Sequence, residues 1–121
     1  MEHVHTACAF LTHARAGDGA MARALVTSNA RHHNMYFAAG MDVLIDAIVQ
    51  ASHEFPASTF TIKRIVAEGD MVVIHSHVTH TVDDIGMSVV HMFRFEAGLI
   101  AELWDIGQVI PPDCPNRDGL F

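Results

Sequence analysis

The chain has 121 residues and carries 14 Asp and Glu against 7 Lys and Arg, a formal net charge of −7. This length favours one domain over residues 1–121. The acidic balance argues against binding to nucleic acid or to an anionic membrane surface, because both require a basic footprint. Half of the residues are hydrophobic, so a globular core is expected. Ten histidines are the unusual feature of the composition.

The sequence predicts a cytoplasmic protein with reduced thiols. Its longest apolar stretches are only as long as strands, too short to cross a bilayer. The first residues, Met1 to His5, lack the basic region and apolar run of a signal peptide. Cys8 and Cys114 cannot form a disulfide framework, and neither belongs to a CxxC motif.

The N-terminal half is expected to be mainly helical. A first helix runs from Val4 to Ala14, with Phe10 and Leu11 facing a core. Asp18 follows it and caps a short helix from Ala20 to Val26, because its carboxylate can accept free N–H groups of the first turn. The polar segment Thr27 to Asn34 is expected to be irregular. A third helix, from about Met41 to Ser52, has apolar residues at helical spacing: Val43, Leu44, Ala47, Ile48 and Ala51.

After Pro56 the pattern changes to strands. Four are expected, and they cover Thr59 to Ala67, Met71 to His80, Met87 to Phe95 and Leu99 to Val109. Short loops join consecutive strands, which predicts an antiparallel meander. Three prolines after residue 110 predict an irregular tail. Helices followed by an antiparallel sheet give an α+β fold class, with the N-terminal helices packed on one face of a curved sheet.

Several segments of this sequence resemble the SnoaL-like proteins of the nuclear-transport-factor-like superfamily. They are Val90–Phe95, Ile100–Gln108, His33-Asn34, Ile65–Asp70, Val73–His77 and Asn116–Phe121. The resemblance implies a cone-shaped α+β barrel with an internal pocket and no cofactor. His91 is followed by Asp105 fourteen residues later, as in the polyketide-cyclase branch of the family. The implied activity is acid/base catalysis, an aldol-type cyclisation or isomerisation of a small hydrophobic carbonyl compound.

Strand geometry also brings His91 and Asp105 together. The turn near Ala97 makes them near cross-strand neighbours, within a residue of register. Alternation places Val89, His91, Phe93 and Phe95 on one face, and Leu99, Leu103 and Asp105 on the matching face. Asp105 is then a candidate general base or acid, and His91 would orient it or protonate an enolate oxygen. The alternative is a buried structural pair.

Three other histidines and Asn34 are candidates for the pocket wall, together with Phe93. The resemblance places His33 and Asn34 at the pocket mouth, where Asn34 would hold a substrate carbonyl and His33 would carry a second proton. A turn Asn beside an exposed His is the alternative, and His32 is expected to have no role. His75 and His77 share one strand face, so they either line the pocket or join His91 as metal ligands. No metal site is assigned.

Trp104 should lie on the opposite face of its strand from Asp105, beside Ile100 and Ile106. An outward Trp generally packs against another surface, and the resemblance implies dimerisation through this face. We therefore expect a homodimer. The other expected partner, implied by the resemblance, is a small hydrophobic molecule. A non-catalytic ligand-binding module of the same fold is the rival function.

Overall fold

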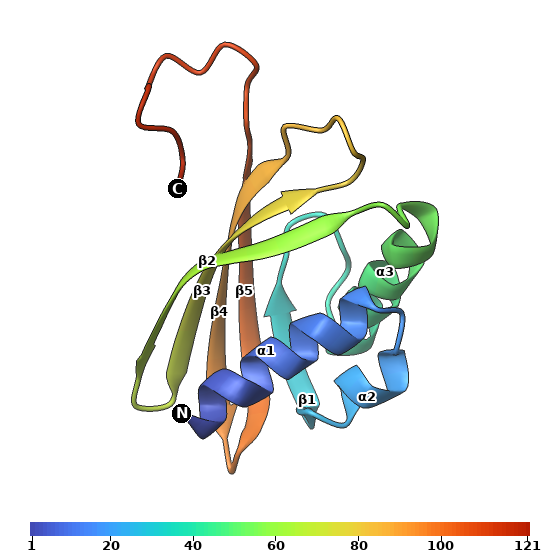
Figure 1. Ribbon diagram of the computed structural model, residues 1–121. Helices are drawn as coiled ribbons and strands as arrows, with labels where there is room; N and C mark the ends of the chain where they lie inside the picture. Colours follow the sequence, from blue (N-terminus) through green and yellow to red (C-terminus); the bar gives the residue numbers. More distant parts are fainter.

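The computed structural model describes residues 1–121 and contains three helices and five strands (Figure 1). In chain order they are α1 (Glu2–Arg15), α2 (Gly19–Arg23), β1 (Val26–His33), α3 (Met41–Glu54), β2 (Thr59–Glu68), β3 (Met71–Thr79), β4 (Met87–Glu96) and β5 (Leu99–Val109). The four predicted C-terminal strands are confirmed, and so is the irregular tail after residue 110. None of the helices combines the length and the apolar character that crossing a membrane requires.

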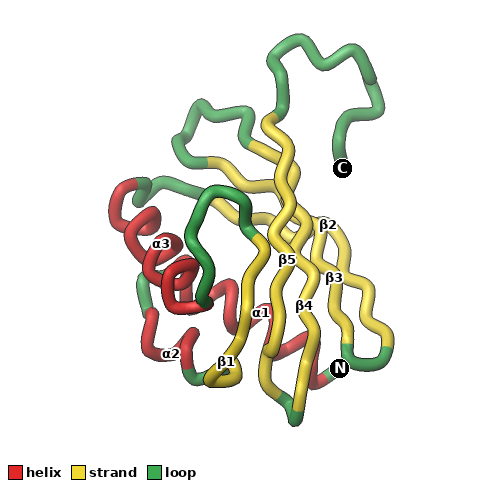
Figure 2. Tube along the Cα trace, turned by 180° about the vertical axis from the view of Figure 1, so that it is seen from behind, coloured by secondary structure: helices red, strands yellow, loops and turns green.

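The five strands form one open, mixed sheet in the order β1-β5-β4-β3-β2. Strands β2 to β5 make the predicted antiparallel meander, and β1 adds to its edge in parallel with β5. The helices pack on one face of the sheet, and Figure 2 shows the other face without helical cover. We call these the inner and the outer face. The predicted α+β plan of helices on a curved sheet is confirmed, and the sheet does not close.

Strand β1 is the main departure from the sequence-based prediction. The segment Thr27 to Asn34 was expected to be irregular, and most of it pairs with β5 instead. Ala30 and His32 are buried, while Arg31 and His33 are exposed. An edge strand tolerates this polar composition because its outward side chains reach water while its backbone groups pair with the neighbouring strand.

Asp18 caps α2 as predicted, since the backbone N–H of Met21 donates to its Oδ1 at 3.1 Å. The helix itself is shorter than expected and ends at Arg23. Val26 was assigned to this helix, but it pairs with Ile100 at the start of β1. The parallel pairing with β5 therefore competes with the last helical turn and prevails.

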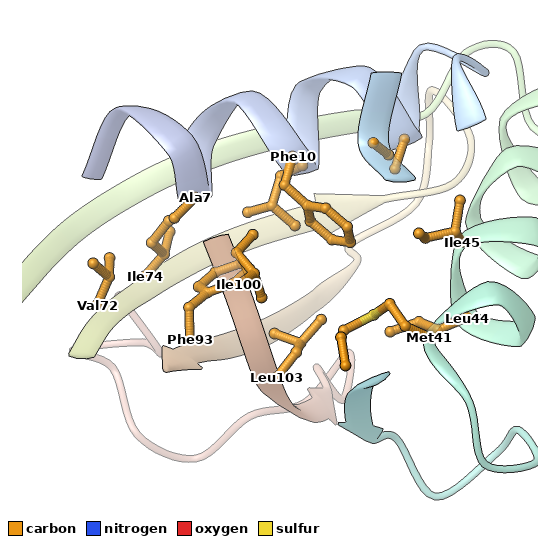
Figure 3. Close-up of a cluster of buried hydrophobic side chains, with 14 of the residues drawn as sticks. Ala7, Phe10, Met41, Leu44, Ile45, Val72, Ile74, Phe93, Ile100 and Leu103 are labelled. Atoms are coloured by element: carbon orange, nitrogen blue, oxygen red, sulfur yellow. The ribbon is translucent and has the colours of Figure 1, made fainter. Parts of the chain in front are cut away.

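The core lies between α1, α3 and the inner face of the sheet. Phe10 and Leu11 are buried as predicted, and the Phe10 ring meets Phe93 edge-on with centroids 6.1 Å apart. In α3 the buried stripe is rotated from the predicted one, because Ile45 is fully buried and Val43 is 40% exposed. Figure 3 draws these core side chains and labels ten of them: Ala7, Phe10, Met41, Leu44, Ile45, Val72, Ile74, Phe93, Ile100 and Leu103.

Candidate active site

His91 of β4 and Asp105 of β5 are direct cross-strand partners on the inner face of the sheet. His91 Nε2 lies 3.4 Å from Asp105 Oδ1. Both side chains are largely buried, with 9% and 16% of their surface exposed. An imidazole and a carboxylate thus lie close together in a low-dielectric setting, where the charge of Asp105 acts on His91.

A β-bulge sets this pairing. The tight turn at Ala97 and Gly98, both with positive φ, places Phe95 opposite Ile100. The register then shifts by one residue, so that Arg94 faces Glu102. Without that shift His91 would face Trp104, and Asp105 would lie on the other face of the sheet.

The bulge also corrects two predictions for the start of β5. Leu99 was expected to share the inner face with Asp105, but it is 36% exposed and lies opposite Glu96. Ile100 was expected beside Trp104 on the outer face, but it is fully buried in the core. The extra residue in β5 interrupts the alternation of faces, so strict alternation predicts the wrong face for Leu99 and Ile100.

Asn34 is the third member of the site and follows directly after β1. Its Nδ2 donates to Asp105 Oδ2 at 2.8 Å, and its Oδ1 accepts the backbone N–H of Tyr36 at 2.9 Å. Because the second bond fixes which end of the amide is the oxygen, the donor end must face Asp105. Asp105 therefore has His91 at one oxygen and Asn34 at the other.

His32 holds the segment that carries Asn34. The ring is buried against the inner face, its Nε2 donates to the carbonyl oxygen of Ala38 at 2.8 Å, and its Nδ1 accepts the backbone N–H of Asn34 at 3.1 Å. This pair of bonds fits the neutral ring with the proton on Nε2. The sequence predicts no role for His32. If residues 26–33 are treated as a strand, the alternation of Ala30 and His32 predicts that the His32 side chain faces inward.

The environment of His91 favours the neutral imidazole. Burial lowers the pKa of His91, the Asp105 carboxylate opposes this, and the positive charge of Arg15 lowers the pKa further. The net shift is downward. His91 Nδ1 is buried and has no hydrogen-bond partner. A buried, unsatisfied N–H costs about 1–3 kcal/mol, so we assign the ring proton to Nε2, the nitrogen near Asp105.

Two aromatic side chains lie near His91. The ring centroid of Phe60 lies 6.1 Å from that of His91, and the Phe93 centroid lies 6.2 Å from it. Phe93, a predicted pocket residue, is on the same face as His91 but is fully buried in the core. Phe60 also lines a groove of about 570 Å³ between α1 and β2. The groove is not lined by His91 or Asp105, so Phe60 is the residue that touches both regions.

His33, predicted at the pocket mouth, lies on the outer face. Its Nε2 is 2.6 Å from Glu102 Oε2, and its ring stacks on Trp104 with centroids 5.3 Å apart. His33 and Asn34 diverge because successive residues of an extended chain point to opposite sides. His33 is therefore not brought to Asp105.

His75 and His77 also lie on the outer face, away from His91. Their Nε2 atoms bond Ser88 Oγ at 2.8 Å and the carbonyl oxygen of Ile85 at 2.7 Å. The ring of Phe121, in the tail, lies over both. The cross-strand neighbour of His91 on β3 is Ile74, one residue out of phase with both histidines. The three-histidine metal set is not assembled, because strand alternation separates its members.

Comparison with known proteins gives a consistent family and fold. The family model of the SnoaL-like domain matches residues 7–103, which include His91 and end two residues before Asp105. No curated protein is a significant match.

Many solved structures share the fold. A protein assigned as a SnoaL-like polyketide cyclase from Jannaschia sp. CCS1 has a TM-score of 0.74 at 17% identity, over 88% of this chain and 85% of that one. An uncharacterised cystatin-fold protein from Novosphingobium aromaticivorans has 0.72 at 22% identity, over 88% and 98%. A cystatin-like protein of unknown function from Methylobium petroleophilum PM1 has 0.78 at 18%, over 96% and 82%. At these identities the likeness concerns the fold.

Proposed function

The chain belongs to the SnoaL-like domain family, and from that premise we propose that it is a cofactor-independent acid/base enzyme. Its substrate is a small hydrophobic carbonyl compound. The reaction begins with removal of a proton from the carbon next to the carbonyl and continues as an aldol-type cyclisation or an isomerisation.

The observation that carries this proposal is the buried His91–Asp105 pair with Asn34 behind it. A carboxylate with little hydration is a strong base toward a carbon acid. A neutral imidazole N–H beside it is a good donor to an oxygen that gains negative charge. In an enolisation Asp105 would therefore act on the carbon that loses its proton, and His91 on the carbonyl oxygen.

In the proposed step Asp105 takes the proton as the C–H bond breaks. The electron pair of that bond moves into the enolate, and the carbonyl oxygen gains negative charge. His91 Nε2–H donates a hydrogen bond to that oxygen, and Asp105 later returns the proton. Asn34 has a different role from the one first expected. Its amide is committed to Asp105 and Tyr36, so it positions the base rather than the substrate.

Proton exchange tests this function without knowledge of the natural substrate. The protein is mixed with 2-tetralone in D₂O, and loss of the protons next to the carbonyl is followed by NMR. We expect the wild-type protein to exceed the buffer rate, and Asp105→Asn to lower the catalysed rate by about 100-fold or more. Asp113→Asn, at an exposed position of the tail, is the matched control.

The binding module is the rival outcome of the same experiment. It predicts that 2-tetralone binds while its exchange rate stays at the buffer value. Unchanged exchange in Asp105→Asn would remove Asp105 from the chemistry.

A further inference from the structure

Arg15, at the end of α1, is a partly buried cation without an acidic partner. Its Nη2 donates to Ser58 Oγ at 3.3 Å and to the carbonyl oxygen of Thr59 at 3.4 Å, both long bonds to neutral acceptors. The N–H groups on Nε and Nη1 bond no protein atom. By contrast, the guanidinium groups of Arg23, Arg31 and Arg94 all lie against carboxylates.

Arg64 and Arg117 also form no ion pair with an acidic side chain, but both are exposed, whereas Arg15 is partly buried. Partial burial makes an unpaired charge costly, and it lowers the pKa of Arg15. Unused guanidinium donors in such a setting form a ready site for a planar anion, which they can bind with two parallel hydrogen bonds.

Arg15 lies in the wall of the groove between α1 and β2, which run side by side in Figure 1. The groove has a volume of about 570 Å³, within the range of small-molecule sites. Its lining combines apolar side chains, among them Leu11 and Phe60, with a few polar groups, among them Arg15 and Ser58. An apolar wall with one cation fits a ligand that has a hydrocarbon body and one negative group.

Phe60 connects this groove to the candidate active site. The Arg15 guanidinium carbon lies 4.9 Å from the centroid of the Phe60 ring, and the centroid of the His91 ring lies 6.1 Å from the same Phe60 centroid. The charge of Arg15 is also felt at His91. A ligand seated at Arg15 would therefore extend along Phe60 toward the His91–Asp105 pair.

We propose that this groove binds an apolar or aromatic carboxylate, with its acid group on Arg15 and its hydrocarbon body against Leu11 and Phe60. If this ligand is the substrate, the proposal rests on the proposed function. It then adds that the carbonyl compound also carries a carboxylate.

Two probes of equal shape test the proposal by binding alone. 2-Naphthoate and the neutral 2-naphthamide are titrated into the protein by calorimetry. We expect naphthoate to bind about tenfold more tightly or better, because charge-assisted hydrogen bonds favour the anion. Arg15→Met should remove this preference, and Arg15→Lys should retain part of it. Arg117→Met, in the exposed tail, should leave it unchanged.

NMR on the wild-type protein gives a second measurement that needs no variant to fold. Naphthoate should shift the Arg15 side-chain N–H signal together with Ser58 and Phe60. Equal affinity for the two probes, failure of naphthoate to bind, a preference that survives Arg15→Met, or shifts confined to another surface would each overturn the proposal. Asp105→Asn should bind naphthoate normally while losing exchange, which separates failure of this site from failure of the proposed chemistry.

Discussion

His33 and Asn34 are adjacent in the sequence and serve opposite faces of the sheet. His33 Nε2 lies 2.6 Å from Glu102 Oε2 on the outer face, while Asn34 Nδ2 donates to Asp105 Oδ2 at 2.8 Å on the inner face. A single step along an extended backbone thus decides which of the two residues joins the candidate active site.

This relationship gives a matched pair of variants. Asn34→Ala removes a hydrogen bond that fixes the Asp105 carboxylate, so we expect the rate of 2-tetralone exchange to fall about tenfold with little change in ligand affinity. His33→Ala, one residue earlier, should leave exchange unchanged. NMR exchange rates and calorimetric affinities check both. Equal losses of rate in the two variants would contradict the positioning role of Asn34.

The lowered pKa of His91 predicts acid sensitivity of the fold. In the unfolded chain His91 titrates near its ordinary value of 6.5, and burial holds the folded value below that. As the pH falls below 6.5, the unfolded state binds the proton first, so the free energy of unfolding decreases. Above that pH both states are neutral at His91, and the effect vanishes. His91→Gln should therefore weaken the loss of stability between pH 7 and pH 5.

Urea unfolding at several pH values measures this effect. For one uncompensated proton the slope is at most about 1.4 kcal/mol per pH unit. Burial, reinforced by Arg64, also lowers the pKa of His75, which contributes with the same sign. His75→Gln is therefore measured alongside. Full acid sensitivity in His91→Gln would show that the buried imidazole does not control it.

The outer face carries a row of side chains across four strands, and we propose that a second copy of this chain covers it. The row is made of cross-strand neighbours: Val66, Val73, Met92 and Trp104. Val66 is 62% exposed, and Ile106 near Trp104 is 52% exposed. The tail packs on His75 and His77 and leaves both of these apolar residues uncovered.

A homodimer through this face predicts that Val66→Arg and Ile106→Arg raise the dimer dissociation constant about tenfold or more. Val82→Arg, in the loop before β4 and 86% exposed, should not change it. Analytical ultracentrifugation at micromolar concentration makes the comparison. A wild-type protein that sediments as a monomer would exclude the dimer.

Local signals in the sequence were sufficient for the β2–β5 meander and for the approach of His91 to Asp105. Strands β3 and β4 alternate in burial along most of their length, and the short connections between consecutive strands favour antiparallel pairing. The exact register of β4 and β5 depends on the bulge after Ile100. No residue type in this segment predicts a bulge. The pairing was therefore predictable only to within one residue.

Features built from distant parts of the chain were not predictable in the same way. Strand β1 carries its inward pattern on Ala30 and His32 alone, and its partner lies about 70 residues away in β5. Arg15 ends an apolar helix, and its isolation becomes visible only when Ser58 and Phe60 are placed beside it. Propensity and periodicity describe neighbours in sequence and do not report such contacts.

The parallel pairing of β1 with β5 has a consequence for how the protein assembles. The His91–Asp105 contact belongs to a hairpin of consecutive strands, so closing it orders only a short loop. The Asn34–Asp105 bond instead spans 71 residues, and contacts of such separation form late in folding because a long loop must be ordered first. Asp105 and His91 are thus expected to come together early in folding. The Asn34–Asp105 hydrogen bond then forms when β1 pairs with β5. Fraying of β1 would break the Asn34–Asp105 hydrogen bond while the β4–β5 hairpin stays intact.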